Sequence, residues 1–554
     1  MASVKSWALR IFVIAVLAAG AVWFHHKRQN RPTRIKLATA KGILLIGNGT
    51  EIATLDPHMA NGQPEHFIIT SLFEGLVAPD AEDPDKTAPG VAQSWETKDY
   101  VNWIFHLRPD ARWSDGNPVT ADDFIYGWKR ILSPELGSDY ADMLHLLKGG
   151  EDFHTGKTKD FSTVGVRAPD PLTLEVTLDG PAPHFPGMLK HYAWFPIPRQ
   201  AIEKFGTMTQ RDTAWARPGH IVGNGPFMLE SWRINHFISV KRNPAYWDAK
   251  NVRLNGIEFY AIENSEAEER TFLDNQLHVT KAVPLASVPI YRANPPPWFK
   301  QSPEMTTEFY RCNVTRPPLD NPKVRNALSL ALDRKVLTNE IIKSGHIPAT
   351  GLVPPGITDE YQSPKTSSFD PEAARKLLAE AGFPEGKGFR AIQILTNNND
   401  SARTVAEFFQ ESWRKQLGIE VSILQQDWQV YLDSMNKLRF DVVRGGWVGD
   451  YLDPYTFLSI FRSTDGNNNT GWKSPIYDDL MLSATREQNP ATRLKIMHDA
   501  EDLLLTEMPM IPIFWRMDSQ LQRSEVLNWK NSKIGHRCYK AIDIGPIQPL
   551  QSWP

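Results

Sequence analysis

The pattern of apolar and polar positions predicts alternating strands and helices along most of the chain. Residues 103–108 alternate between apolar and polar side chains, which is the period of a strand with one buried face. Thr120 precedes an acid three residues later, a capping arrangement that predicts the start of a helix. Apolar side chains then recur at helical spacing at Phe124, Trp128 and Ile131. This segment is therefore predicted to form a strand followed by a helix.

Four more helices are predicted farther along the chain. An Asn-Pro pair opens the helix expected from Pro322, and an Asp-Pro pair opens the helix expected from Pro371, because proline is favoured in the first helical turn. Two longer helices are expected at residues 401–417 and 490–508, each followed by an apolar strand. Strands and helices that alternate in this way predict α/β or α+β lobes, and the sequence has no repeat of fixed period.

The first 40 residues are predicted to be a leader and a tether. Residues 11–24 form an uncharged, mostly apolar run behind two bases, as in a secretory signal peptide, and Ala19-Gly20-Ala21 offers a cleavage site. Extending the run to residues 7–24 leaves an uncleaved membrane anchor as the alternative. Bases that flank an apolar run favour the cytoplasmic side of a membrane, so the bases after residue 24 conflict with an exported body. Both interpretations therefore stay open. Residues 28–41 are expected to form a polar tether.

The net charge hides an uneven distribution. The 554-residue chain has 61 Lys and Arg against 64 Asp and Glu, a net charge of −3. Its first 34 residues carry six bases and no acid, so the rest of the chain has a net charge of −9. This balance argues against a nucleic-acid partner. Two cysteines exclude a disulfide scaffold or a multi-cysteine zinc module, and 18 tryptophans suit a protein that grips an amphipathic ligand.

Motifs for catalysis are absent from the sequence. It has no His-Glu-x-x-His, Gly-x-Ser-x-Gly or Cys-x-x-Cys. Residues 156–158 match the end of a phosphate-binding loop, but the position where that loop requires an earlier glycine is occupied by Glu151. The acid pairs at 122–123 and 478–479 fall at predicted helix starts, where capping explains them better than acid–base chemistry. These observations favour binding over catalysis, and we expect no cofactor and no metal ligands.

Specific residues then resemble a known family. The motif at 107–124 (LRPDARWSDGNPVTADDF) is similar to the signature of the peptide/nickel class, family 5, of extracellular solute-binding proteins of ABC importers. Other motifs of this family occur in the family's order at residues 54–58, 72–76, 318–328 and 446–458. The resemblance extends from about residue 43 to residue 546 and is strongest for the oligopeptide-binding branch.

The resemblance implies an α/β fold of the periplasmic-binding-protein type II, with two lobes and an extra domain on the first lobe. The implied parts of the chain are a signal peptide or anchor plus tether (1–40), a hub lobe (41–75, 193–306 and 516–554), an extra domain (76–192) and a second lobe (307–515).

The resemblance also implies a function. An oligopeptide would be captured between two closing lobes and delivered to an ABC permease and its ATPase, without hydrolysis. The protein would be exported to the periplasm or cell surface, would act as a monomer and could be anchored by residues 7–24. Two alternatives keep the fold: a non-peptide ligand, such as a metal chelate, haem or an oligosaccharide, or a membrane-anchored receptor without a transport role.

Five residues match family positions that contact the peptide. Asp450 is expected to hold the peptide's ammonium group. Arg444 is expected either to meet a peptide carboxylate or to pair with a nearby acid such as Asp450 itself. Trp428 and Trp447 are expected to form aromatic walls and Tyr140 to line a pocket, with core packing as the alternative for each.

The chain also departs from the family pattern. Met435 and Ala402 occupy positions that hold an arginine and a histidine in the best-known branch, which puts the preferred peptide length and side-chain pockets in doubt. Val448 takes one position of that branch's linked cysteine pair. Whether Cys312 and Cys538 pair is left open by the sequence.

Overall fold

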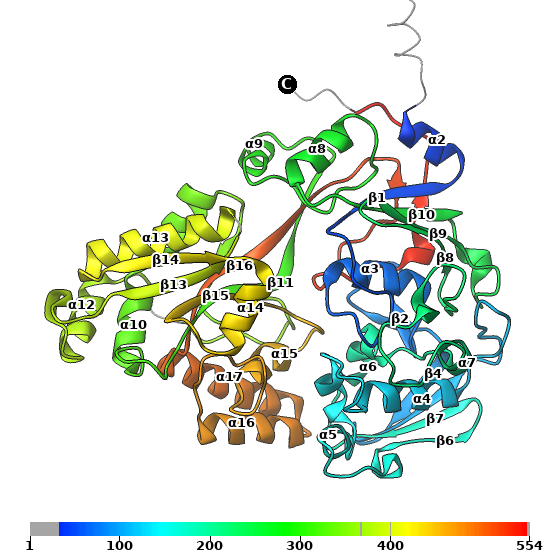
Figure 1. Ribbon diagram of the computed structural model, residues 1–554, viewed down its shortest axis with the longest axis horizontal. Helices are drawn as coiled ribbons and strands as arrows, with labels where there is room; N and C mark the ends of the chain where they lie inside the picture. The colour runs from blue at the N-terminus through cyan, green and yellow to red at the C-terminus, as the bar shows by residue number, and fades with distance from the viewer. Residues whose placement is uncertain (1–32, 366–367, 399, 551–554) are drawn as a thin grey trace, which may run out of the picture.

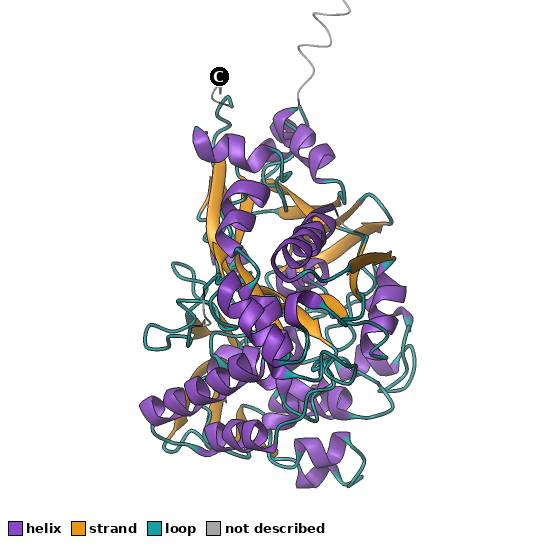
Figure 2. Ribbon diagram, turned by 90° about the vertical axis from the view of Figure 1, so that its left-hand side faces the viewer, coloured by secondary structure: helices purple, strands orange, loops and turns teal. Residues whose placement is uncertain are grey.

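The computed structural model describes residues 33–365, 368–398 and 400–550, without the side chains of residues 400, 428 and 429. Its main sheets belong to two lobes that lie side by side in Figure 1, with an additional domain below the first lobe. Seen from the side, the strands lie inside and helices flank them (Figure 2). The predicted mixture of strands and helices is confirmed.

The first lobe is built on a four-stranded sheet. Its first pair of strands is parallel and the others are antiparallel. In order, the strands are β1 (Ile43–Gly49), β10 (Gly256–Ala261), β9 (Phe237–Arg242) and β8 (Phe227–Arg233). Its helices include α2 (Arg34–Ala40), α3 (Gln63–Leu72), α8 (Ser265–Leu273) and α9 (Ser287–Ala293).

The additional domain contains an antiparallel sheet and several short helices. The strands in order are β4 (Ala92–Thr97), β5 (Asn102–Leu107), β7 (Thr173–Thr177) and β6 (Val166–Asp170). The helices include α4 (Ala121–Leu132), the 3₁₀ helix η1 (Ala141–Leu146), α5 (Gly150–His154) and α6 (Phe185–Met188). Helix α7 (Arg199–Glu203), just beyond the expected boundary at residue 192, packs against α4. The predicted cap is confirmed, because the Thr120 backbone N–H donates to Asp123 Oδ2 at 2.7 Å.

The second lobe is built on a six-stranded mixed sheet. The strands in order are β12 (Ile347–Pro348), β16 (Met510–Leu521), β11 (Phe299–Cys312), β15 (Val442–Val448), β13 (Ile392–Asn397) and β14 (Val421–Gln426). The larger helices are α10 (Pro322–Leu330), α12 (Pro371–Glu380), α13 (Asp400–Leu417), α14 (Trp428–Asn436), α16 (Pro475–Arg486) and α17 (Pro490–Glu507), with the short α15 (Tyr455–Leu458). The four helices predicted here are confirmed. α13 and α17 lie within one residue of their predicted bounds, and α10 and α12 begin at the predicted prolines. α12 ends just before Gly382, the glycine expected to stop it.

Two long strands, β11 and β16, join the lobes. They pair antiparallel from Phe299 opposite Leu521 to Arg311 opposite Met510. Phe299 and Leu521 pack into an apolar cluster of the first lobe, whereas Tyr310, farther along β11, packs into the core of the second lobe. Figure 1 shows both strands passing between the lobes. The boundaries proposed near residues 306 and 515 fall within these strands.

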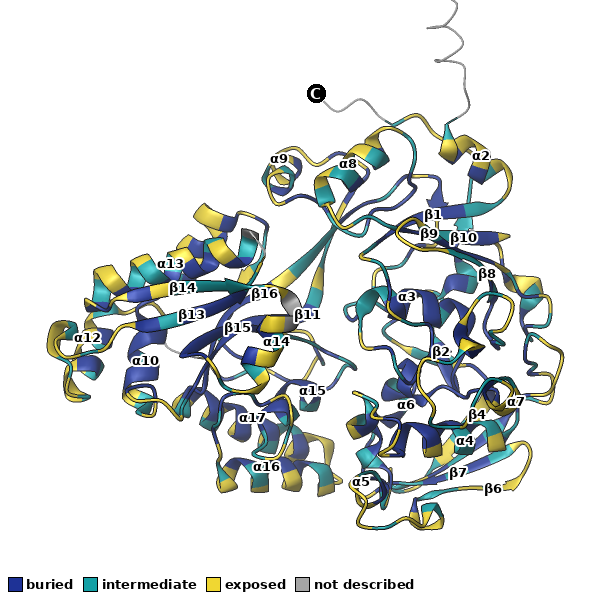
Figure 3. Ribbon diagram, viewed as in Figure 1, coloured by how far each residue is buried: buried dark blue, intermediate teal, exposed yellow. Residues whose placement is uncertain are grey.

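Burial follows the layers. Buried residues run along the strands, whereas exposed residues mark the outer faces of α13 and α16 (Figure 3). Within the described part of the chain, no helix is long and apolar enough to cross a membrane, and residues 7–24 lie outside that part. Cys312 and Cys538 are both free, so they do not pair.

The expected polar tether is wrong from Thr33 onwards. Thr33 caps α2 by accepting a hydrogen bond from the Lys36 backbone N–H. Ile35 and Ala38, one helical turn apart, are buried in a cluster with Tyr260. Two apolar side chains on one face were enough to dock this short, otherwise polar segment on the first lobe.

A buried ion pair between the additional domain and the first lobe fixes the Leu-Asp-Pro motif. Arg130 of α4 donates to Asp56 Oδ1 at 2.8 Å, and the Trp215 indole N–H donates to Asp56 Oδ2 at 3.2 Å. Burial disfavours the charged carboxylate, but Arg130 outweighs it and holds the pKa of Asp56 below its ordinary value. The motif therefore has a structural role here.

Replacing Asp56 by Asn is expected to lower the free energy of unfolding by about 3–5 kcal/mol, because the guanidinium of Arg130 is left buried without its counter-charge. Urea unfolding followed by circular dichroism measures the change. Glu203→Gln, which breaks the exposed pair of Glu203 with Arg199 (3.0 Å), is the control and should cost less than about 1 kcal/mol. Equal effects of the two substitutions would contradict the structural role.

Candidate functional site

Asp450 lies in the loop that follows β15, at the edge of the second lobe. The preceding residue, Gly449, is held by a hydrogen bond from its N–H to the Met305 carbonyl oxygen of β11 at 2.8 Å. The Asp450 backbone N–H donates to Thr456 Oγ1 of α15 at 3.2 Å, and that hydroxyl faces Asp450 Oδ2 at 3.4 Å. Strand β11 and helix α15 thus fix the carboxylate in place.

The electrostatic setting of Asp450 is unusual for a carboxylate. The residue is half-buried, and among the residues that the structure describes no cationic side chain forms an ion pair with it. Burial raises the pKa of its carboxyl to about 7, and the hydrogen bond from Thr456 offsets only part of this effect. A carboxyl in such a place is stabilised either by taking up a proton or by a cation that is brought to it.

Aromatic side chains of the additional domain lie near this carboxylate. The Tyr140 ring packs on His191 at 4.6 Å and on Tyr192 at 5.8 Å, both between ring centroids. Burial raises the pKa of the Tyr140 hydroxyl, and the Asp450 carboxylate raises it further. The same two causes, together with Tyr140, raise the pKa of Tyr192. The fold thus brings Tyr140 and Asp450, predicted as separate family positions, into electrostatic contact across the lobes.

The loop after Asp450 makes a direct contact between the lobes. The Tyr451 ring stacks on His184, at the start of α6, with centroids 5.6 Å apart and planes 15° apart. Asp453 accepts hydrogen bonds from both terminal nitrogens of Arg493, at 2.7 and 2.9 Å, and lies 3.8 Å from His184 Nδ1. In Figure 1, α15 lies at the edge of the second lobe that faces α6. The lobes are therefore closed against each other at this point.

Arg444 is engaged within the second lobe. Its Nε and Nη2 donate to the two carboxylate oxygens of Glu308 on β11, at 2.5 and 3.1 Å, and its Nη1 donates to Asn397 Oδ1 at 3.0 Å. Burial lowers the pKa of the guanidinium, but Glu308 more than compensates and raises it. Arg444 therefore pairs with Glu308 here, not with Asp450 as our structural alternative suggested.

Of the two predicted wall tryptophans, the structure describes the side chain of Trp447 but not that of Trp428. Trp447 of β15 is half-buried against an apolar cluster of the second lobe, and its indole N–H lies 3.5 Å from Thr456 Oγ1. Trp428 is the first residue of α14, but its side chain lies outside the described part of the structure.

The substituted family positions lie in the second lobe. Met435 of α14 places its sulfur 3.8 Å from Arg311 Nη1, and Ala402 is buried in α13. Arg311 is itself buried beside Phe309, with its guanidinium 4.9 Å from the ring centroid. These positions add no charge of their own to the second lobe.

Sequence reasoning missed several residues that shape the site. Glu308, the partner of Arg444, lies in β11 directly before Phe309 and Tyr310, and an acid next to apolar side chains in a predicted strand was an available signal. Thr456 lies six residues after Asp450 within the same motif. Tyr192 and His184 come from the first half of the chain, and no local pattern connects them with residue 450.

The comparisons with known proteins agree with this architecture. The family of bacterial extracellular solute-binding proteins, family 5 middle, matches residues 86–469. The chain belongs to this family. The periplasmic oligopeptide-binding protein OppA of Escherichia coli K12 is 35% identical over 518 residues, which cover 92% of this chain and 93% of OppA. Membership of a family of extracellular binding proteins supports an exported location.

Solved structures of family members have the same fold. Haemophilus influenzae OppA in complex with the peptide RPPGFSPFR is 31% identical, with a TM-score of 0.81 over 91% of this chain and 99% of that chain. The unliganded open form of the murein tripeptide-binding protein MppA is 30% identical, with a TM-score of 0.71 over 91% and 97% of the two chains. The expected two-lobed α/β fold of the periplasmic-binding-protein type is confirmed.

Asp450→Asn is expected to stabilise the ligand-free protein, because folding raises the pKa of this carboxyl from 3.8 to about 7 and so disfavours its charged form. The destabilisation is complete above pH 7 and disappears as pH falls towards 4. At pH 8 the substitution should therefore add roughly 1–2 kcal/mol to the free energy of unfolding, after allowance for solvent screening.

The measurement is urea unfolding at pH 8 and at pH 4.5 for both proteins. Asp479→Asn on α16 is the matched control, because Asp479 is exposed. A stabilisation that is the same at both pH values, or a loss of stability at pH 8, would contradict the assigned environment of Asp450.

Proposed function

We propose that this protein captures oligopeptides by their free amino group, between its two lobes, and presents them to the permease of an ABC importer. One observation carries the proposal: Asp450 is a half-buried carboxylate at the meeting point of the lobes with Thr456 as its side-chain partner and, within the described residues, no cation paired with it. A peptide ammonium supplies the charge that this site lacks.

The energetics of this contact follow from burial. A charge-assisted hydrogen bond contributes about 1.5–3 kcal/mol net, and it is strongest where water has been expelled. Tyr140 and Tyr192 close the site from the other lobe, so the ammonium would be enclosed only when the lobes come together. The ligand therefore binds the closed form more tightly and shifts the population towards it.

The remaining residues have secondary roles in the proposal. Trp447 and Trp428 form apolar walls for peptide side chains, and Tyr140 lines the pocket of the ammonium. Arg444, held by Glu308 and Asn397, presents its remaining N–H groups to a peptide carboxylate. Main-chain hydrogen bonds along an extended peptide supply affinity without demanding a particular sequence.

Relatives support the peptide as ligand. The Escherichia coli and Haemophilus influenzae relatives are oligopeptide-binding proteins by name, and the latter has been solved with a nine-residue peptide. By analogy, we propose that the closed protein docks on a permease as a monomer, that it hydrolyses nothing, and that it works in the periplasm or at the cell surface. Residues 7–24 serve either as a cleaved signal peptide or as an anchor.

The domain division that accompanies this proposal keeps residues 41–75, 193–306 and 516–554 as the hub lobe, 76–192 as the extra domain and 307–515 as the second lobe. The crossing of β11 and β16 between the lobes supports it, because these strands supply a natural hinge.

The proposal predicts how charge on either partner affects affinity. Calorimetry should compare a tripeptide with a free amine and its N-acetylated form, on the wild-type protein and on Asp450→Asn. Acetylation should weaken binding to the wild type by roughly 10–100-fold, since it removes the charge-assisted hydrogen bond. On Asp450→Asn both peptides should bind weakly and about equally.

Asp479→Asn is the control and should keep the full preference for the free amine. Equal affinity of both peptides for the wild type would overturn the role of Asp450 but not peptide capture. Absence of binding for a broad set of peptides would overturn peptide capture itself.

A further inference from the structure

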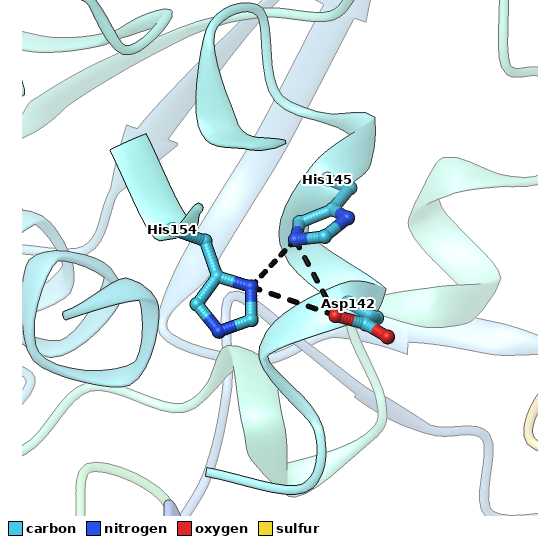
Figure 4. A group of neighbouring side chains, drawn as sticks. All are labelled: Asp142, His145 and His154. Carbon is cyan, nitrogen blue, oxygen red and sulfur yellow. Dashed lines mark hydrogen bonds and ion pairs between the residues drawn. The ribbon is translucent and has the colours of Figure 1, made fainter. Parts of the chain in front are cut away.

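Three side chains of the additional domain converge on one point. Asp142 and His145 lie on η1, and His154 is the last residue of α5 (Figure 4). His145 Nε2 is 2.8 Å from His154 Nδ1, and Asp142 Oδ1 is 3.4 Å from the former nitrogen and 3.5 Å from the latter. Three potential metal-ligand atoms thus face one common point.

Local structure builds this convergence. In a 3₁₀ helix, residues three apart eclipse each other, so Asp142 and His145 share one side of η1. The chain then turns at Gly149, which has φ of +69°. A Cβ at this position would lie 2.7 Å from the Thr163 carbonyl oxygen, so a glycine is needed for the turn. The turn returns α5 against η1 and places His154 beside His145.

The distances suit a tetrahedral ion. Zinc binds histidine nitrogen and carboxylate oxygen at roughly 2.0–2.2 Å, so ligand atoms of a tetrahedral site lie about 3.3–3.5 Å apart. The two distances from Asp142 already match this range. The His145–His154 distance of 2.8 Å must open by roughly half an ångström, which small rotations of two half-buried imidazoles can supply.

Proton counting also favours a cation. If both rings are neutral and bonded to each other, one nitrogen donates its hydrogen and the other accepts it. That single hydrogen lies between the two nitrogens, so no second hydrogen remains for the Asp142 oxygen, which faces both of them. A divalent cation satisfies all three atoms at once.

We propose that Asp142, His145 and His154 form a binding site for a divalent transition-metal ion of the zinc class. Two imidazoles and one carboxylate select zinc and its neighbours over Mg²⁺ and Ca²⁺, which prefer all-oxygen ligand sets. The Asp142 side chain is 61% exposed, so the fourth coordination position is open to water or to a ligand from solution.

The test is calorimetric titration of ZnCl₂ into the purified full-length protein, first stripped with a chelator and exchanged into a chelator-free buffer. The wild type should bind one equivalent that is lost from His154→Ala and weakened at least tenfold in Asp142→Asn. With Co²⁺, the wild type should show the visible absorption of a four-coordinate ion. His106→Ala is the matched control and should leave this equivalent unchanged, because His106 faces a single carboxylate, Glu96, at 3.4 Å.

Thermal unfolding without metal checks that each variant folds, and Asp142→Asn alters an exposed side chain that should be tolerated. Loss of the bound equivalent of Zn²⁺ in a variant that still folds supports the proposed metal site. Failure of the wild type to bind a stoichiometric ion, or unchanged binding in Asp142→Asn and His154→Ala, would overturn it and leave a hydrogen-bonded trio.

Discussion

The proposed function of this protein rests on a carboxylate, that of Asp450, with which no cation of the described chain forms an ion pair. Other buried acids of its motifs have strong partners: Asp56 pairs with Arg130, and Asp453 with Arg493. Asp450 has Thr456, and no cation from the described chain pairs with it. Keeping such a charge partly out of water destabilises the protein by itself, and in the proposed function the ammonium group of the ligand offsets this cost.

The two strands that cross between the lobes, β11 and β16, couple ligand binding to closure of the lobes. β11 supports the loop of Asp450 through Met305, and the same strand continues into the apolar cluster of the first lobe. Tyr140 approaches the carboxylate from the additional domain, across the boundary between the lobes. The site is therefore complete only when the lobes meet, and a ligand that binds both sides stabilises the closed form.

Local signals predicted several of the helices, because a cap or a helix-opening proline acts within one turn: Thr120 and Pro322 mark starts that the structure confirms. Long-range partners could not be predicted in the same way. The pairing of Arg444 with Glu308 depends on the register between two strands far apart in sequence. Asp450 and Tyr140 were predicted from the resemblance to the family, and their proximity appeared only in three dimensions.

A crystal structure of the protein with a bound free-amine tripeptide tests the central claim most directly. The account predicts that the peptide lies between closed lobes with its ammonium nitrogen within about 3 Å of an Asp450 carboxylate oxygen. A peptide bound between the lobes with its ammonium group remote from Asp450, or paired with another acid, would contradict the account.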